Sequence, residues 1–180
     1  IILQGPPGTG KTYQAANAII DLIKQGKKVG VSANSHKVIH NLLDRVEKTA
    51  EEKEVTFKGL KKRGRKEEDI YSGKFISTPE KKEDNDSCFI SSIKDTNINL
   101  HAGTAYHFSK GYFDQELDYL FVDEAGQVSL ANLIAMGRSA KNIILIGDQM
   151  QLSQPIKAVH PGEAGKSALD YLLQGRDTIP

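Results

Sequence analysis

The sequence is poor in cysteine and lacks any long hydrophobic run. Its single cysteine, Cys88, excludes a disulfide bond within the chain and favours an intracellular protein. No apolar stretch approaches the ~20 residues that a membrane-spanning helix needs, and the first residues do not have the pattern of a signal peptide. We therefore expect a cytoplasmic protein, or a nuclear one in a eukaryote, with no membrane partner.

An excess of charge of either sign is also missing. The 180 residues include 24 basic and 23 acidic side chains, so the net charge is +1. The composition as a whole gives no sign of a nucleic-acid partner, and any surface that binds one must be local. The length suits one domain with its own core, which we expect to span residues 1–180. Because the sequence begins without methionine, directly on an apolar strand, we expect a fragment of a larger protein.

What the sequence does contain is a phosphate-binding loop near its start. The pattern of glycine, four residues and Gly-Lys-Thr is matched without a mismatch by Gly5, Pro6, Pro7, Gly8, Thr9, Gly10, Lys11 and Thr12. Such glycines let successive backbone N–H groups face one anion, and the helix that follows adds the positive end of its dipole. We expect Lys11 to reach the β- and γ-phosphates of ATP and the Thr12 hydroxyl to coordinate Mg²⁺.

The hydrophobic pattern predicts a parallel sheet flanked by helices. Apolar strands are expected at residues 1–4, 29–33, 98–103, 119–123 and 143–147. Helices are expected after the phosphate loop and after Ser35, which is a good helix N-cap. The fold class is therefore α/β, a three-layer P-loop NTPase domain with a mainly parallel central sheet and helices on both faces.

Residues 50–97 differ in composition from the rest of the chain. They are rich in lysine, glutamate, aspartate and glycine, with only short apolar islands such as residues 88–90. We interpret them as an insertion with short strands and mobile loops within the domain. Six basic residues lie between Lys58 and Lys66. This run either contacts a nucleic-acid backbone or forms a solvated loop, and the sequence leaves both interpretations open.

Polar residues follow two of the expected strands. Asp123 and Glu124 come directly after the strand at 119–123, where ligands bind in a parallel sheet. We expect Asp123 to lie near Thr12 and hold Mg²⁺, and Glu124 to deprotonate the attacking water. The alternative is an acidic pair that only complements a helix dipole. Gln151 follows the strand at 143–147, and we expect it to sense the γ-phosphate; the alternative there is a polar turn.

Taken in order, segments 5–12, 123–127 and 147–155 resemble motifs I, II and III of superfamily 1 helicases. The resemblance is to the branch that includes the nonsense-mediated-decay helicase and the Okazaki-fragment helicase-nuclease, and it covers about residues 1–49 and 98–175. It implies a RecA-like first motor domain. In such a domain Lys11, Glu124 and Gln151 act on ATP, while Thr12 and Asp123 hold Mg²⁺.

The resemblance also implies partners. Ser35 and Thr104 match positions that contact single-stranded DNA or RNA, although the family often has Pro-Ser-Asn where this chain has Asn34-Ser35-His36. A second RecA-like domain, with an arginine finger, would complete the ATP site from outside this chain. We therefore expect the isolated domain to bind ATP weakly and to have little activity.

Two other functions compete with an ATP-dependent helicase. An AAA+ ATPase that remodels proteins has a similar phosphate loop and acidic pair, but the stretch from Lys11 to Asp123 is unusually long for that class. A nucleotide-gated binding module with decayed catalysis is the second alternative. The intact Lys11, Asp123 and Glu124 argue against such decay.

Overall fold

The centre of the fold is a seven-stranded parallel sheet. The computed structural model describes residues 1–6, 8–81, 86–148 and 166–173. The strand order is β1-β7-β6-β2-β5-β3-β4. The strands are β1 (Ile2–Gln4), β2 (Val29–Ser32), β3 (Lys58–Lys61), β4 (Ile76–Ser77), β5 (Ile98–Ala102), β6 (Leu117–Val122) and β7 (Ala140–Gly147). The predicted parallel sheet is confirmed, with β6 and β7 beginning two and three residues earlier than expected.

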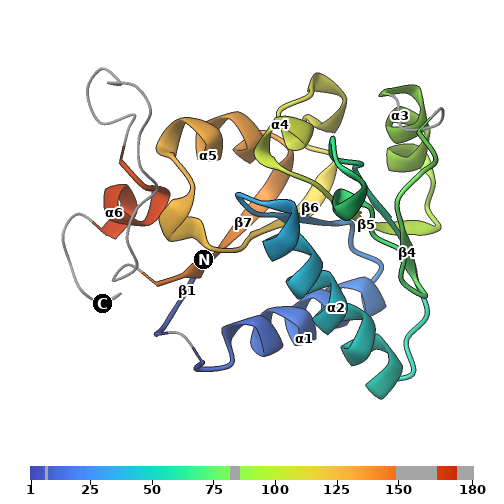
Figure 1. The fold of residues 1–180 in the computed structure, drawn as a ribbon, viewed down its shortest axis with the longest axis horizontal. Coiled ribbons are helices and arrows are strands. Elements are labelled where there is room, and N and C mark those ends of the chain that lie inside the picture. Colours follow the sequence, from blue (N-terminus) through green and yellow to red (C-terminus); the bar gives the residue numbers. More distant parts are fainter. Residues whose placement is uncertain (7, 82–85, 149–165, 174–180) are drawn as a thin grey trace.

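Helices cover both faces of this sheet, as predicted (Figure 1). On one face lie α1 (Lys11–Lys24) and α2 (His36–Glu52), whose buried residues form one apolar cluster with β2 and β5. A second apolar cluster joins the other face to helices α3 (Asp86–Lys94), α4 (Ala105–Phe108), α5 (Leu130–Gly137) and α6 (Ala168–Leu173). No helix in the described part of the chain has the length and apolar character of a membrane span.

The parallel register brings several loops to one edge of the sheet. Val31 of β2 is paired with Phe121 of β6 and with Ala102 of β5. At the edge strand β1, Gln4 is paired with Gly147 of the neighbouring strand β7. The chain therefore leaves β1, β2, β5, β6 and β7 on the same side. Ligands of parallel sheets bind at this carboxyl edge.

Residues 50–97 extend the same sheet. Strands β3 and β4 continue it in parallel beyond β5. The expectation of short strands is wrong for residues 88–90, which lie in α3 and not in a strand. There Phe89 and Ile93 are buried on one helix face, and such a short apolar run does not distinguish strand from helix. Nor is the basic run only a solvated loop, because its first residues form β3 and Lys61 is fully buried.

A buried carboxylate joins β4 to α2. Glu47 of α2 is only 9% exposed. It accepts hydrogen bonds from the backbone N–H groups of Lys74 (3.1 Å), Phe75 (3.0 Å) and Ile76 (2.8 Å). These donors belong to the chain entering a two-residue strand, which has few ladder bonds of its own. The carboxylate therefore takes over part of the hydrogen bonding that a longer strand would supply.

Substitution of Glu47 by alanine should destabilise the domain strongly. It leaves three backbone donors without a partner, and each buried unsatisfied group costs ~1–3 kcal/mol. We expect the free energy of unfolding to fall by about 3 kcal/mol or more in urea denaturation. Glu51 on the same helix forms only an exposed ion pair with Lys74. Glu51→Ala is the matched control, and its effect should stay within about 0.5 kcal/mol; equal effects of the two substitutions would contradict this role of Glu47.

Two histidines are buried in the second apolar cluster. His101 is fully buried, and its Nε2 lies 3.0 Å from Ser92 Oγ. Burial, with a smaller contribution from the charge of Lys28, lowers the pKa of His101 to about 3. Burial also lowers the pKa of His107 well below its usual value. His107 packs edge-to-face against Phe89 at 4.6 Å between ring centroids. Both rings are therefore neutral in the folded protein at neutral pH.

The neutral state of His101 should make stability depend on pH. Below the ordinary histidine pKa of ~6.5 the histidine of the unfolded chain binds a proton, whereas His101 in the folded protein stays neutral. The contribution of His101 to the free energy of unfolding is therefore fully present above that pH and is lost as the pH drops toward 3. His101 alone should contribute a slope of about 1.4 kcal/mol per pH unit between pH 6 and 4. Urea denaturation of the wild type and of His101→Gln, whose amide can still bond to Ser92, measures this slope. Parallel pH profiles of the two proteins would show that His101 does not titrate in this way.

Candidate nucleotide site

The phosphate loop connects β1 to α1. Gly8 and Gly10 have φ values of 80° and 81°, a left-handed conformation that side chains disfavour. The Thr9 hydroxyl donates to the Pro6 carbonyl at 2.8 Å, which closes the loop. Helix α1 begins at Lys11, so the positive end of its dipole faces the loop. Pro7, also predicted to bind nucleotide, lies outside the described residues.

The Lys11 ammonium lies over the loop. It donates hydrogen bonds to the carbonyls of Gly5 at 2.5 Å and Pro6 at 2.7 Å. The cation is thus held at the mouth of the loop, within a side-chain rotation of the concave face. An anion bound there would compete with neutral carbonyls for this ammonium. An anionic phosphate adds the attraction of opposite charges, which a neutral carbonyl lacks.

The acidic pair follows β6 in a tight turn. The Asp123 N–H donates to the Ser32 carbonyl at 2.8 Å and so continues the ladder with β2. Glu124 has a left-handed backbone, with φ 49°, although it is not glycine. Its N–H donates to Asp123 Oδ1 at 2.9 Å. Such strained residues concentrate at functional sites, since packing must hold them in place.

Burial raises the pKa of Asp123. The hydrogen bond from the Glu124 N–H acts in the opposite direction, the negative charge of Glu124 raises the pKa further, and the positive charge of Lys11 lowers it. The carboxylate is thus partly desolvated, and among the described residues it forms no ion pair. A divalent cation would meet this need, because it favours the ionised form.

Most of the predicted site residues converge on one cavity of about 410 Å³. Its walls contain Gly8, Gly10, Lys11, Thr12, Asp123 and Glu124, although the loop and the acidic pair are more than 100 positions apart in the sequence. Gly5 and Pro6 accept the hydrogen bonds of Lys11, and Thr9 closes the loop through its bond to Pro6. Gln151 lies outside the described residues, so its predicted role as a sensor is not tested.

Four residues of the cavity were not predicted. Val38 and Asn41 come from the first turns of α2, Gly147 ends β7, and Asp148 follows it. The hydrophobic pattern of the sequence predicts Val38 only as part of the apolar face of a helix. Asn41 is an exposed position on that helix, and no local pattern connects it to the phosphate loop. Asp148 belongs to the segment after β7, in which the sequence predicts a role only for Gln151.

The donor atoms of this cavity fit ATP with Mg²⁺. The Thr12 hydroxyl and the Asp123 carboxylate are hard oxygen ligands of the kind that Mg²⁺ prefers. The described residues contain no group of three or more histidine, cysteine, aspartate or glutamate side chains that could hold a metal by themselves. A cation here would therefore need oxygens from a bound phosphate chain to complete its shell, as Mg²⁺ does at phosphate loops.

The loops that carry the acidic groups are packed backbone to backbone. A Cβ atom added to Gly126 would come within 2.9 Å of the Asp148 carbonyl oxygen, so only glycine allows this approach. The Asn34 amide donates to the Gln127 carbonyl at 3.3 Å and joins the loop after β2 to the same segment. The ends of β2, β6 and β7 are thus fixed relative to one another at the cavity.

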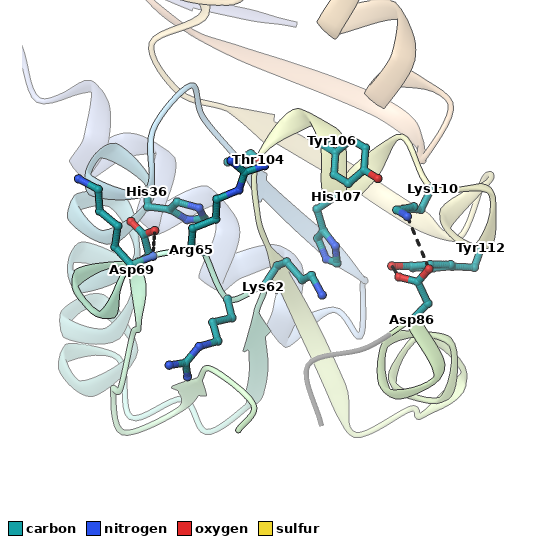
Figure 2. Close-up of a pocket in the computed structure, with 13 residues that line it drawn as sticks. His36, Lys62, Arg65, Asp69, Asp86, Thr104, Tyr106, His107, Lys110 and Tyr112 are labelled. Atoms are coloured by element: carbon teal, nitrogen blue, oxygen red, sulfur yellow. Dashed lines mark hydrogen bonds and ion pairs between the residues drawn. The ribbon is translucent and has the colours of Figure 1, made fainter. Parts of the chain in front are cut away.

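The two residues predicted to contact nucleic acid lie at helix starts on the same edge. Ser35 is exposed and caps α2, with its hydroxyl accepting the Val38 N–H at 3.3 Å. Thr104 precedes α4, and its side chain makes no capping bond. Thr104 lines a cavity of about 520 Å³ on the side of the sheet edge formed by β5 and β3 (Figure 2). Ser35 does not line that cavity, but the next residue, His36, does.

Comparison with known proteins agrees with this geometry. A family model described as an AAA domain matches residues 1–171. The chain is 28% identical over 159 residues to the DNA replication ATP-dependent helicase/nuclease DNA2 of Saccharomyces cerevisiae, a match that covers 87% of this chain and 10% of that protein. The chain thus spans about a tenth of the length of this relative.

The fold is also found among solved structures. The C-terminal part of the Fun30 ATPase domain matches with a TM-score of 0.51 and 11% identity, covering 81% of this chain and 46% of that one. At this identity the likeness concerns the fold alone. The family match extends from the phosphate loop past the acidic pair and the end of β7. The chain therefore belongs to the AAA-domain family of P-loop ATPases and is a RecA-like domain of the superfamily 1 helicase type.

Proposed function

We propose that this domain binds and hydrolyses ATP as a motor of a superfamily 1 DNA or RNA helicase, and that hydrolysis drives translocation along a single strand. The observation that carries the proposal is the convergence of Lys11, Thr12, Asp123 and Glu124 on one cavity at the carboxyl edge of the sheet. These groups supply a cation for phosphates, two oxygen ligands for a metal and a carboxylate for water. ATP hydrolysis uses every one of these groups.

Each side chain has a separate task. Lys11 moves from the Gly5 and Pro6 carbonyls to the β- and γ-phosphates, which the loop N–H groups also hold. Thr12 and Asp123 would hold Mg²⁺, which would supply positive charge to neutralise the phosphates. Glu124 orients the attacking water and accepts its proton. This role is supported by the strained backbone of Glu124 and by its place in the wall of the cavity.

The strand contacts follow from neighbouring loops. Ser35 and Thr104 would bind the backbone of single-stranded DNA or RNA, as the family resemblance implies. Gln151 would report the presence of the γ-phosphate. The Asn34–Gln127 hydrogen bond supports coupling between the two functions, because it joins the strand-contacting loop to the segment that carries Glu124. A second RecA-like domain with an arginine finger would close the cavity, so this domain alone should turn over slowly.

Glu124→Gln should separate ATP binding from hydrolysis. The amide keeps the shape and a hydrogen-bonding oxygen but cannot take a proton, and general bases contribute ~10²–10⁴-fold to rate. We expect the rate of single-turnover hydrolysis to fall by about 100-fold or more, while the Kd for MgATP changes less than about threefold. Glu116→Gln, an exposed position before β6, is the control and should leave the rate unchanged. Normal turnover by Glu124→Gln would mean that another group is the base.

Lys11→Ala should act on binding itself. It removes a charge-assisted contact to the phosphates, and such a contact is worth ~1.5–3 kcal/mol. The Kd for MgATP, measured by calorimetry or with a fluorescent analogue, should rise about 10- to 100-fold. Lys24→Ala, at the far end of the same helix, controls for the loss of a positive charge. Unchanged affinity in Lys11→Ala would place the nucleotide elsewhere.

A further inference from the structure

A concentration of positive charge lines the cavity that contains Thr104. Five cationic side chains and two carboxylates line its 520 Å³; the cations are Lys62, Arg63, Arg65, Lys66 and Lys110, and the carboxylates are Asp69 and Asp86. We call this cavity the basic pocket. It is lined by the loop between β3 and the 3-10 helix η1 (Glu67–Asp69), by the start of α2 and by the α4 region. No motif of the sequence resemblance includes the β3–η1 loop.

The loop that supplies most of this charge has a defined shape. Asp69 accepts the Lys66 N–H at 3.0 Å through its carboxylate, and its carbonyl accepts the buried Lys61 ammonium. At the other end of the loop the Lys62 N–H donates to the Ala102 carbonyl of β5 at 2.7 Å. The cations are therefore presented by a backbone tied to the sheet. A preorganised loop loses less conformational entropy on binding than a mobile one.

Two of these cations are available to a ligand. Arg65 is exposed and forms no ion pair with any residue that the structure describes. Figure 2 shows its side chain directed from the loop toward Thr104. Lys66 pairs with Glu68 at 2.9 Å, but both side chains are 73% exposed. Such an exposed pair contributes little and is easily exchanged for a phosphate.

An exposed aromatic ring stands on the rim of the basic pocket. Tyr106 is 73% exposed, and the Lys110 ammonium lies 4.9 Å from its ring centre. Tyr106 also lines a second cavity of about 200 Å³, whose walls include Ala33, Val128 and Met136. The ring therefore lies between a cationic pocket and a partly apolar one. A nucleotide has the matching polarity, since it joins an anionic phosphate to an apolar base face, whereas an acidic peptide or an inorganic anion would use only the charge.

The position of the basic pocket connects it to the nucleotide cavity. Both lie at the carboxyl edge of the sheet, and the first turn of α2 contributes to both. His36 lines the basic pocket, while Val38 and Asn41 line the nucleotide cavity. A strand bound in the basic pocket would thus contact the same helix end as the nucleotide.

We propose that the basic pocket is a subsite for single-stranded nucleic acid, in which Arg65 and Lys66 bind successive backbone phosphates and Tyr106 stacks on a base. The subsite extends the track from Thr104 outward to the β3–η1 loop. The inference rests on the proposed function, because it takes the same strand as its ligand. It adds three residues to the strand-binding surface, and it gives the direction in which the strand crosses that surface. The family resemblance gives neither.

The test measures strand binding and ATP binding separately. In Arg65→Gln/Lys66→Gln, affinity for an oligo(dT) or oligo(U) strand should fall roughly 25-fold at 0.1 M salt, and the slope of log K against log salt should decrease by about 1.4, because each phosphate contact on a single strand contributes ~0.7. The Kd for MgATP should not change. The control, Lys24→Gln/Lys48→Gln, removes the same charge from exposed positions of α1 and α2 and should leave affinity and slope within about twofold.

Tyr106 provides a second readout. A strand carrying 5-iodouracil should crosslink to Tyr106 on irradiation, and Tyr106→Ala should weaken binding about tenfold with the salt slope unchanged, as expected for stacking.

Three outcomes would overturn the proposal. If Arg65→Gln/Lys66→Gln binds as wild type while Thr104→Ala is weakened, the strand avoids this pocket and the proposed function stands. If the control pair loses as much strand affinity, binding depends on the total charge of the domain and not on a specific site. Absence of strand binding by the wild type would remove the proposed function as well.

Discussion

The parallel pairing of β2 with β5 and β6 is the constraint on which the site depends. It forces the chain to leave these strands on one side, where Asp123, Asn34 and Thr104 each follow a strand end. The same rule, through the pairing of β1 with β7, brings the phosphate loop to that side. In an antiparallel sheet, neighbouring strands end on opposite sides, so with this strand order Asp148 after β7 and Asp123 after β6 could not line one cavity. The chemistry is therefore a consequence of strand direction before it is a consequence of any side chain.

Close packing then converts proximity into fixed geometry. The contact between Gly126 and the Asp148 carbonyl leaves no room for a side chain, and the Ser32 carbonyl holds the Asp123 N–H. These contacts stabilise the left-handed backbone of Glu124, which would be costly in isolation. Desolvation of Asp123 follows from the same packing and raises its pKa until a cation compensates. Strain and burial in this turn are thus connected, since both result from packing the ends of three strands together.

Sequence patterns predicted this arrangement where each residue's role is local or follows from strand direction. The apolar strands, the phosphate loop and the position of Asp123 after β6 are of this kind. The patterns failed where a role depends on distant partners. Lys58–Lys61 has two lysines in four residues and does not resemble a strand, yet Lys61 is buried because the Asp69 carbonyl accepts its ammonium. Asn41 belongs to the nucleotide cavity only because the start of α2 and the phosphate loop line the same cavity, which no spacing reveals.

The start of α2 combines a role that the local sequence predicts with roles that depend on distant partners. Ser35 caps the helix, an arrangement visible in the sequence, and the cap fixes where the helix axis begins. From that start, helical geometry places His36 on the basic pocket and Val38 and Asn41 on the nucleotide cavity, on opposite sides of the first two turns. Asn34, just before the cap, is hydrogen-bonded to Gln127 in the segment after Glu124. A shift of the acidic segment during hydrolysis must therefore either break that bond or displace the helix start. In the second case the basic pocket changes shape, which gives the proposed motor a short physical route from ATP to the strand.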